Sequence, residues 1–307
     1  MNKEIISVGV LSYNSEKTIL ETLNSILSQD YGSKHIELLI GDDASTDNSQ
    51  KIIKNWVDIN RDAFHEVKIL FQNRNKGVVN NFNFVCYNAS SCWIKPIAAD
   101  DILINNCITE LVLFSKENKT AKCIFCKVQK FNEASNLGSY PRNNYYFNLT
   151  AEKQFQALLI DNFVPAPGAF LELNFLKKMG FAEKHISMED YPLWLKITSK
   201  NSRLYLLEKE LVKYRIGNSL SNSTNRLINT IINKDVYSCK IRYLKEYTGS
   251  KPMYLLLLWD IKLSRLNDFI RIYIFKNKKK PFYNFLSSIF RLLSPLFLMR
   301  KITFLSK

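Results

Sequence analysis

The sequence predicts an α/β protein with a mainly parallel central sheet flanked by helices, followed by a basic helical region at its C-terminal end. Apolar runs of strand length alternate with helical patterns through the first hundred residues, which is typical of βαβ units. A chain of 307 residues is also long enough to bury a full core. Positive charge gathers near the end: residues 240–307 contain 15 Lys+Arg and 3 Asp+Glu, whereas the first 239 residues contain 28 and 25.

Four strands are expected within the first hundred residues, because each run is apolar or β-branched and is followed by polar residues. These strands cover Ile5–Leu11, Glu37–Ile40, Val67–Phe71 and Trp93–Ala98. Between and after them, apolar residues at helical spacing predict helices. The first helix is expected to start near Ser15. The other three are expected over Gln50–Val57, Val78–Tyr87 and Ile102–Phe114.

The rest of the chain is less regular. Leu137–Asn148 is rich in Gly, Pro, Asn and Tyr and indicates a loop, whereas Phe170–Met179 indicates a strand that leads into a short helix closed by Gly180. A further helix is expected to begin at Asp190 or just before it, and from about Ser223 the pattern becomes helical and basic. The expected divisions are a domain over residues 1–222, with halves 1–121 and 122–222, and a basic amphipathic region over residues 223–307.

The six cysteines show no spacing that indicates a disulfide framework. They are Cys86, Cys92, Cys107, Cys123, Cys126 and Cys239. Cys123 and Cys126 form a single CxxC without a second pair or a histidine cluster, so we expect no zinc site. The interpretation is buried free thiols in a reducing cytoplasm. No leader pattern is expected at the N-terminal residues, and no apolar stretch reaches the length of about 18 residues that a spanning helix needs.

Two pairs of acidic residues directly follow predicted strands. Asp42-Asp43 follows the second strand and Asp100-Asp101 follows the fourth. Because ligands of parallel sheets bind beyond the carboxyl ends of the strands, both pairs are expected on one rim. The adjacent carboxylates of Asp100 and Asp101 can hold Mg²⁺ or Mn²⁺ and leave positions for substrate phosphates. Asp42 and Asp43 are expected to accept hydrogen bonds from a base or a ribose. The alternative interpretation of each pair is a helix cap, since Asp is favoured there.

A third acidic site, Glu189-Asp190, stands at a predicted helix start. Asp190 is either an N-cap, with Pro192 in the first turn, or a general base for a proton donor within hydrogen-bond reach. Taken singly, each of the three acidic sites has a structural interpretation, so their order along the chain is the more specific signal.

Several motifs in a fixed order closely resemble those of family 2 glycosyltransferases. They are Val8-Gly-Val-Leu-Ser-Tyr-Asn14, Ser25-Ile-Leu-Ser-Gln29, Leu39-Ile-Gly-Asp-Asp-Ala-Ser-Thr-Asp47, Asn73-Arg-Asn-Lys-Gly77, Ala99-Asp-Asp101, Met188-Glu-Asp-Tyr-Pro-Leu-Trp194, and Tyr214-Arg215 with Asn218-Ser219-Leu-Ser221. The resemblance covers about residues 5–222. One departure concerns the closing motif: many members have a His between the Tyr-Arg and the Asn-Ser, and this chain is one residue shorter there and lacks it.

The resemblance implies the GT-A fold, a Rossmann-like sheet in which a nucleotide-sugar-binding half (1–121) joins an acceptor-binding half (122–222). It implies that the donor nucleotide is bound by Leu11, Tyr13, Asp43, Lys76 and Asp100, with Tyr13 against the base and Asp43 in a hydrogen bond to it. Asp101, supported by Asp100, is implied as the ligand of Mn²⁺ or Mg²⁺ at the donor's pyrophosphate. Asp190 is implied as the catalytic base of an inverting transfer, with Glu189 and Trp194 on the acceptor side.

The basic tail has three interpretations. Lys and Arg alternate with apolar side chains. Helical spacing is followed by Phe269, Ile272 and Tyr273, and then by Phe285, Ile289, Leu292 and Leu293. We expect an interfacial helical region on a membrane surface, because each cation near anionic headgroups contributes about 1 kcal/mol. A helical subdomain with a solvated basic face is the second interpretation. Nucleic-acid binding is the third, and no nucleic-acid partner is expected.

The expected function is therefore non-processive transfer of a sugar, from a UDP-sugar in the first place, to a lipid-linked saccharide in cell-surface (O-antigen or capsule) polysaccharide biosynthesis. The location expected is the cytoplasmic face of the inner membrane. Processive synthases of the family normally add a Gln-x-x-Arg-Trp motif and spanning helices, and the sequence shows neither. The alternatives are a nucleotidyltransferase, although Leu11–Lys17 contains no phosphate-loop glycine, and a non-catalytic membrane-bound protein that binds a nucleotide-sugar.

Overall fold

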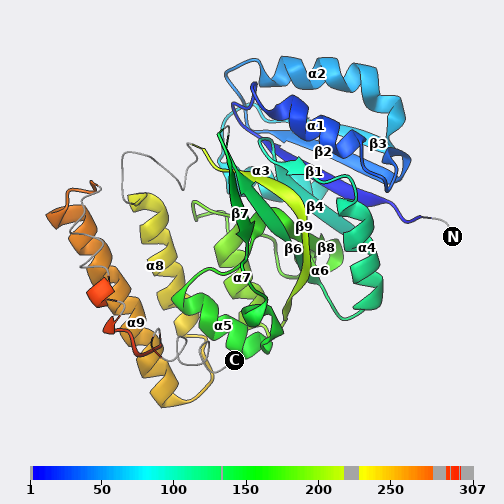
Figure 1. Ribbon diagram of the computed structural model, residues 1–307. Helices are drawn as coiled ribbons and strands as arrows, with labels where there is room; N and C mark the ends of the chain where they lie inside the picture. Colours follow the sequence, from blue (N-terminus) through cyan, green and yellow to red (C-terminus); the bar gives the residue numbers. More distant parts are fainter. Residues whose placement is uncertain are drawn as a thin grey trace.

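The computed structural model describes residues 3–132, 134–217, 228–278, 288–290, 292–296 and 298. A nine-stranded sheet forms its centre, with the order β3-β2-β1-β4-β8-β6-β9-β5 and with β7 paired to β6 (Figure 1). The strands are β1 (Ile6–Ser12), β2 (Ile36–Asp42), β3 (Glu66–Phe71), β4 (Trp93–Ala98), β5 (Ile102–Leu103), β6 (Cys123–Phe131), β7 (Asn136–Tyr140), β8 (Ala169–Glu172) and β9 (Leu204–Arg215).

The first half of the sheet is parallel, as the alternating pattern predicts. Strands β3, β2, β1 and β4 run in one direction, so their carboxyl ends share one edge. Strand β8 is antiparallel to both of its neighbours, β4 and β6, while β6 and β9 are parallel. The prediction of a mainly parallel α/β sheet is confirmed, and the four strands predicted in the first hundred residues are present within one or two residues of their expected bounds.

Helices cover both faces of the sheet, and each face has its own core. The helices are α1 (Ile19–Leu27), α2 (Ser49–Asn60), α3 (Val78–Asn88), α4 (Cys107–Glu117), α5 (Ala151–Ile160), α6 (Leu173–Lys178), α7 (Asp190–Ser199), α8 (Thr230–Leu244) and α9 (Lys251–Phe269). Side chains of α1, α2 and α4 share one apolar core, whereas α3 and α5 to α9 contribute to the other. This division gives three layers, which is the expected architecture for βαβ units.

Helix α3 lies unusually close to the sheet because two strand residues lack a side chain. A Cβ at Gly9 would come within 2.5 Å of the Cγ1 of Val85, and a Cβ at Gly41 would collide with Val85 and Asn81. The amide of Asn81 donates to the carbonyl of Gly41 at 2.9 Å, which fixes the helix over β2. The N-terminal end of α3 is thereby held beside the carboxyl ends of β1 and β2.

The helix predicted over Ile102–Phe114 is wrong in its first turn. Residues Ile102–Leu103 form β5, which pairs antiparallel with β9, and helix α4 begins at Cys107. The partner residues Lys213 and Val212 are more than a hundred positions away in sequence. Long-range pairing therefore overrides the local helical pattern, and α4 starts too far from Asp100-Asp101 to be capped by either carboxylate.

Helices α8 and α9 lie side by side at the end of the molecule remote from β3 (Figure 1). Helix α8 packs against α5 and α7 as well as against α9, so it is part of the folded body. Of the described helices, none combines the length and the apolar character that a bilayer crossing requires. The thiols agree with the sequence interpretation in being free, and all are buried except Cys92.

Candidate active site

The carboxyl ends of β1, β2 and β4 bring most of the predicted donor residues to one edge. Tyr13 directly follows β1, Asp43 directly follows β2, and Asp100 lies two residues after β4. Lys76 lies in the loop between β3 and α3, and its backbone N–H donates to Asp43 at 2.9 Å. The rim expected from parallel-strand geometry is therefore formed.

Asp43 is buried and holds the loop that follows β3. Its carboxylate accepts hydrogen bonds from the backbone N–H groups of Lys76 (2.9 Å) and Gly77 (2.7 Å) and from the side-chain amide of Gln72 (2.8 Å). The side chain is 2% exposed. Asp43 thus shapes the rim through protein contacts, whereas Tyr13 is 47% exposed and free to contact a ligand with its ring.

Asp42, the neighbour of Asp43, uses its carboxylate in hydrogen bonds within the protein. It accepts hydrogen bonds from Ser12, Gln50 and both polar groups of Ser45, at distances of 2.5 to 3.0 Å. These bonds tie the end of β1 to the turn after β2. Asp42 is therefore not available to a ribose or a base, although its position after a strand had made it a candidate.

A cavity of about 600 Å³ lies next to this rim and collects the other predicted residues. Leu11, Asp100, Asp101, Glu189, Asp190 and Trp194 all line it. They come from the ends of β1 and β4 and from the first turns of α7. The structure thus places the predicted metal, base and acceptor-side residues around one space, with Tyr13, Asp43 and Lys76 outside it on the adjoining rim.

Asp101 has one carboxylate oxygen bound and one free. Its Oδ1 accepts a hydrogen bond from the backbone N–H of Arg215 at 2.9 Å, while its buried Oδ2 has no hydrogen-bond partner among the described residues. Burial, and then the charge of Asp100, raise the pKa of Asp101 well above its usual value. Burial also raises the pKa of Asp100.

The free oxygen of Asp101 fits a divalent cation. A buried carboxylate oxygen without a donor is costly, and an oxygen-seeking cation would satisfy it. The described residues contain no cluster of three or more His, Cys, Asp or Glu side chains that could enclose a metal by themselves. A cation held by Asp101 and Asp100 would therefore take its remaining ligands from water or from a phosphate-bearing substrate.

Arg215 fixes the turn that carries the two aspartates. Its Nε donates to the carbonyl of Asp100 at 3.0 Å, its guanidinium forms an ion pair with Glu21, and it lies 4.6 Å from the centre of the Phe131 ring. The sequence contained a signal for this role in the Tyr214-Arg215 motif, but the contact itself was not foreseen. The residues Asn218–Ser221 of the same motif lie outside the described residues.

Glu189 and Asp190 stand at the start of α7 with their side chains partly buried at the cavity wall. Burial, and then the charge of Asp190, raise the pKa of Glu189 to about 7. Burial also raises the pKa of Asp190, against the stabilising backbone N–H groups at the helix start. Glu189 holds the N-cap position of α7 without a side-chain capping hydrogen bond, and Asp190 is the first residue of the helix. The structure thus does not place Asp190 at the N-cap position, and its side chain lines the cavity.

Part of the cavity wall comes from residues that the sequence did not single out. Helix α8 contributes Ile232, Val236 and Lys240, and the segments before α7 contribute Asp161 and Ser187. Helix α8 is fastened there because Asp235 accepts a hydrogen bond from the backbone N–H of Ser187 at 2.9 Å. No motif marks these residues; the apolar periodicity of α8 indicated a helix without indicating the surface against which it packs.

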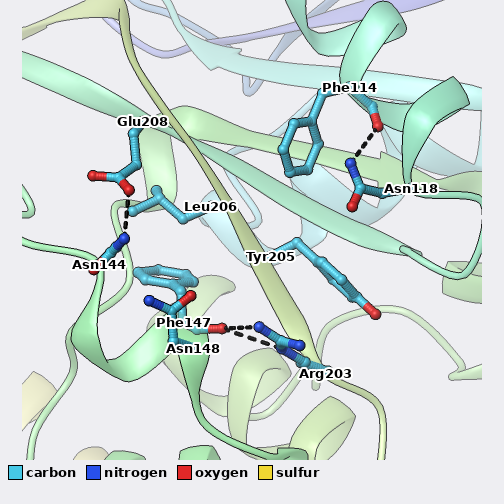
Figure 2. Close-up of a pocket in the computed structure, with 9 residues that line it drawn as sticks. All are labelled: Phe114, Asn118, Asn144, Phe147, Asn148, Arg203, Tyr205, Leu206 and Glu208. Carbon is cyan, nitrogen blue, oxygen red and sulfur yellow. Dashed lines mark hydrogen bonds between the residues drawn. The ribbon is translucent and has the colours of Figure 1, made fainter.

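A second, smaller cavity of about 220 Å³ lies near the N-terminal part of β9 and contains none of the predicted site residues (Figure 2). Its most polar side chain, Arg203, is already engaged by the carbonyl of Phe147 through Nε (3.1 Å) and Nη2 (2.6 Å). The side-chain amide of Asn144 donates a hydrogen bond to the carboxylate of Glu208 (Figure 2). The candidate active site is therefore the larger cavity.

Comparison with known sequences gives the family. The sequence profile of glycosyl transferase family 2 matches residues 7–176. An uncharacterised glycosyltransferase of Methanocaldococcus jannaschii is 24% identical over 304 residues, which is 98% of this chain and 93% of the relative. The UDP-Glc:alpha-D-GlcNAc-diphosphoundecaprenol beta-1,3-glucosyltransferase WfaP of Escherichia coli is 27% identical over 237 residues, covering 73% of this chain and 83% of WfaP.

Solved structures confirm the GT-A fold. The S. aureus TarS fragment 1–349, in complex with UDP, superposes with a TM-score of 0.65 at 20% identity and covers 90% of this chain and 76% of that one. The mannosyltransferase PcManGT of Pyrobaculum calidifontis, in complex with GDP-Man and Mn²⁺, gives a TM-score of 0.60 at 15% identity over 97% of this chain and 83% of that one. Because the family profile matches more than half of its length, this chain belongs to glycosyl transferase family 2.

Proposed function

We propose that the protein is an inverting, metal-dependent and non-processive glycosyltransferase that moves a sugar from a nucleotide-sugar, in the first place a UDP-sugar, to a hydroxyl of a lipid-linked saccharide. The observation that carries this proposal is that one cavity of about 600 Å³ is lined both by Asp101, which has a buried carboxylate oxygen without a hydrogen-bond partner among the described residues, and by Asp190. Asp101 is suited to hold a cation at the diphosphate of the donor, and Asp190 is suited to act as the base at the acceptor hydroxyl.

In this proposal Asp190 is the base. Its carboxylate accepts the proton of the acceptor hydroxyl while that oxygen forms a bond to the anomeric carbon of the donor sugar. The bond from this carbon to the diphosphate oxygen breaks on the opposite face, and the electron pair leaves with the nucleoside diphosphate. The configuration is therefore inverted, and the sugar passes through a state that resembles an oxocarbenium ion.

Asp101 and Asp100 would hold Mn²⁺ or Mg²⁺, and such an ion supplies neutralisation of the negative charge on the leaving diphosphate. The protein's own part is to orient Asp101. The backbone N–H of Arg215 holds Oδ1 of Asp101, and the Nε of Arg215 holds the carbonyl of Asp100, so the turn that carries both aspartates is fixed. On the rim, Tyr13 and the loop held by Asp43 would enclose the base, with Leu11 and Lys76 beside the nucleotide.

The names of two related proteins support the proposed classes of donor and acceptor. WfaP is named for transfer from UDP-Glc to a diphosphoundecaprenol-linked sugar, and TarS is seen with UDP and with UDP-GlcNAc. The acceptor in our proposal has the same chemistry as that of WfaP, a saccharide joined through a diphosphate to a long lipid. In this proposal the reaction belongs to cell-surface polysaccharide biosynthesis, of the kind that makes O-antigens.

A lipid-linked acceptor requires the enzyme to contact a membrane surface. Helix α9 has an exposed apolar face that can make this contact. Large apolar residues on this helix and its extension are at least half exposed and follow helical spacing: Leu255, Trp259, Leu266, Phe269 and Tyr273. The exposed cations Lys262 and Arg265 lie among them. We place the protein on the cytoplasmic face of the inner membrane through this surface, because apolar burial and cation–headgroup attraction act together.

The catalytic proposal is tested by Asp190→Asn in the presence of UDP- and GDP-sugars. Donor binding, followed as a metal-dependent rise in thermal stability, should persist, while transfer to a panel of alkyl glycosides and alkyl-diphosphate-linked sugars should be lost. An active Asn variant would remove Asp190 from the role of base. Release of pyrophosphate instead of a nucleoside diphosphate by the wild-type enzyme would indicate nucleotidyl transfer, and donor binding without any turnover would indicate a sensor.

The membrane proposal is tested by co-sedimentation of the full chain with anionic vesicles. The triple replacement Leu255→Gln, Leu266→Gln and Phe269→Gln should reduce vesicle binding. A matched control replaces Ile59 and Tyr87, which are 82% and 72% exposed on the sheet-covering helices α2 and α3, by Gln and should bind as the wild type does. Equal binding by all three proteins would contradict the assignment to α9.

A further inference from the structure

Two hydrogen-bond donors in the cavity wall have no hydrogen-bond partner in the part of the chain that the structure describes. The indole Nε1 of Trp194 and the hydroxyl of Ser187 are both buried and both lack a hydrogen-bond partner among the described residues. Both side chains line the large cavity. A buried donor left without an acceptor is uncommon in folded proteins, because it loses its hydrogen bonds to water without replacement.

Trp194 is placed for contact with whatever Asp190 acts upon. It lies four residues after Asp190 in α7, so the two side chains share one face of the helix and lie one turn apart. The ring is 2% exposed and is fixed by an edge-to-face contact with Phe125, whose ring centre is 4.8 Å away. Its N–H direction is therefore set by packing before any ligand arrives.

The backbone of Ser187 is held by a contact with α8. Its backbone N–H donates to Asp235 of α8 at 2.9 Å, which leaves its hydroxyl as the unengaged polar group. Met188 and Glu189 separate it from Asp190 in sequence. The two free donors thus lie on either side of the base along the chain.

We infer that Trp194 and Ser187 form a recognition pair that binds a neutral oxygen of the acceptor saccharide. An indole N–H can only donate, so its partner must be an accepting oxygen such as a hydroxyl or an acetamido carbonyl. Five carboxyl side chains line the cavity against two cationic ones, which disfavours an anionic sugar at this position. The inference rests on the proposed function in taking the cavity as the acceptor site.

The pair also explains how selectivity would arise. A saccharide that lacks the accepting oxygen would leave both donors buried and unpaired, and a site built in this way rejects such an analogue more strongly than an apolar pocket does. Removal of the indole N–H should therefore weaken acceptor binding about tenfold, and removal of the hydroxyl about threefold. Donor binding should be unaffected by either change.

The experiment compares Trp194→Phe and Ser187→Ala with the matched control Trp56→Phe. The indole of Trp56 is also buried, but its Nε1 donates to the side chain of Asn24 at 2.8 Å within the protein. We expect Trp194→Phe and Ser187→Ala to raise the acceptor KM and leave the donor KM and kcat near the wild-type values. Trp56→Phe should lower the melting temperature and leave both KM values unchanged.

A second measurement does not depend on turnover. In protein labelled with ¹⁵N at its four tryptophans, the indole signal that disappears in Trp194→Phe should move when acceptor saccharides from the alkyl glycoside and alkyl-diphosphate panel are added with UDP. It should not move with a UDP-sugar alone. Movement with the donor alone would overturn the assignment to the acceptor, and a panel in which no saccharide moves the signal would overturn the recognition pair, leaving water as its occupant.

These outcomes separate the inference from the proposed function. If wild-type transfer is observed and the variants behave as the wild type, the recognition pair is wrong and the catalytic proposal stands. If the donor screen shows no metal-dependent binding, the catalytic proposal fails on Asp101, whereas a saccharide-induced shift of the Trp194 signal would still support the pair.

Discussion

The backbone N–H of Arg215 donates a hydrogen bond to Oδ1 of Asp101 at 2.9 Å, across 114 positions of sequence. This contact joins the end of β9 to the turn after β4. It satisfies one oxygen of a buried carboxylate and leaves the other free. The residue best placed to bind a cation is thus oriented by a residue from the other half of the domain.

Asp101→Asn should raise the stability of the metal-free protein and abolish metal-dependent donor binding. Folding raises the pKa of Asp101, so the native state binds its proton more tightly than the unfolded chain does. The stability contributed by this group is present at low pH and is lost as pH rises from the ordinary Asp value toward the raised one. At neutral pH, an amide that keeps the bond to Arg215 avoids this loss. Thermal melts with and without MnCl₂ and UDP test both effects; a lower melting temperature of the metal-free variant would contradict the argument.

Glu189→Gln should keep activity and remove an ionisation near neutral pH. Burial and the charge of Asp190 raise the pKa of Glu189 to about 7, and burial raises the pKa of Asp190, so the two carboxyl groups titrate as an interacting pair. Activity should fall as pH drops through the raised pKa of Asp190, because the base becomes protonated. A profile of kcat/KM across about pH 5 to 9 should retain this acid limb in the Gln variant. Loss of the limb together with the activity would identify Glu189 as the base instead.

Asp43→Asn and Tyr13→Ala should distinguish a residue that holds the loop beside the nucleotide from a residue that contacts the nucleotide directly. The Asn variant presents an NH₂ group to backbone donors that now face a carboxylate, so it should lose a bond to Lys76 or Gly77 and destabilise the protein by about 1–3 kcal/mol. It should lower donor affinity as well. Tyr13→Ala should lower donor affinity alone, because that ring is 47% exposed. Melting temperature and donor binding measured on both variants decide; an Asn variant with wild-type stability would show that Asp43 does not hold the loop.

Gly168→Ala should displace the segment between Ala166 and Ala169, which lines the cavity. A Cβ at this position would collide with the backbone carbonyl of Cys126, and backbone atoms cannot yield easily. The preceding turn is also held by the buried Lys95, whose ammonium donates to the carbonyls of Pro167 (2.7 Å) and Pro96 (2.8 Å). We expect a lower melting temperature and a higher KM for both substrates. Gly217→Ala, where a Cβ meets no atom of the described residues within 4 Å and the backbone is outside the left-handed region, is the control for the melting temperature.

The parallel half of the sheet could be predicted from the sequence because its strands are continuous apolar runs that end in polar residues. The same logic located Asp100, Asp101 and Asp190, since strand ends and helix starts are local features. The predictions that were wrong concern contacts between residues that lie far apart in sequence. Ile102–Leu103 joins β9 rather than a helix, and nothing within the first 121 residues indicates that partner.

The role of α8 could not be predicted either. An amphipathic basic helix has the same periodicity whether its apolar face meets lipid or another helix. Its burial against α5 and α7 depends on pairs such as Asp235 with Ser187 and Arg242 with Glu183, which lie far apart in sequence. Likewise, the position of Asp43 after a strand predicts a carboxylate on the rim, but only the fold shows that its oxygens are taken by Gln72, Lys76 and Gly77.

The wall that α8 contributes to the cavity has a consequence for enzyme engineering. The family profile ends at residue 176, whereas Ser187, Trp194, Val236 and Lys240 lie beyond it. In the reaction that we propose, substitutions on this helix would therefore change the acceptor sugar without changing the strands that carry Tyr13 and Asp43. An α8 transplanted from a relative should carry that relative's choice of partner sugar with it, which makes this helix the natural unit for re-engineering such enzymes.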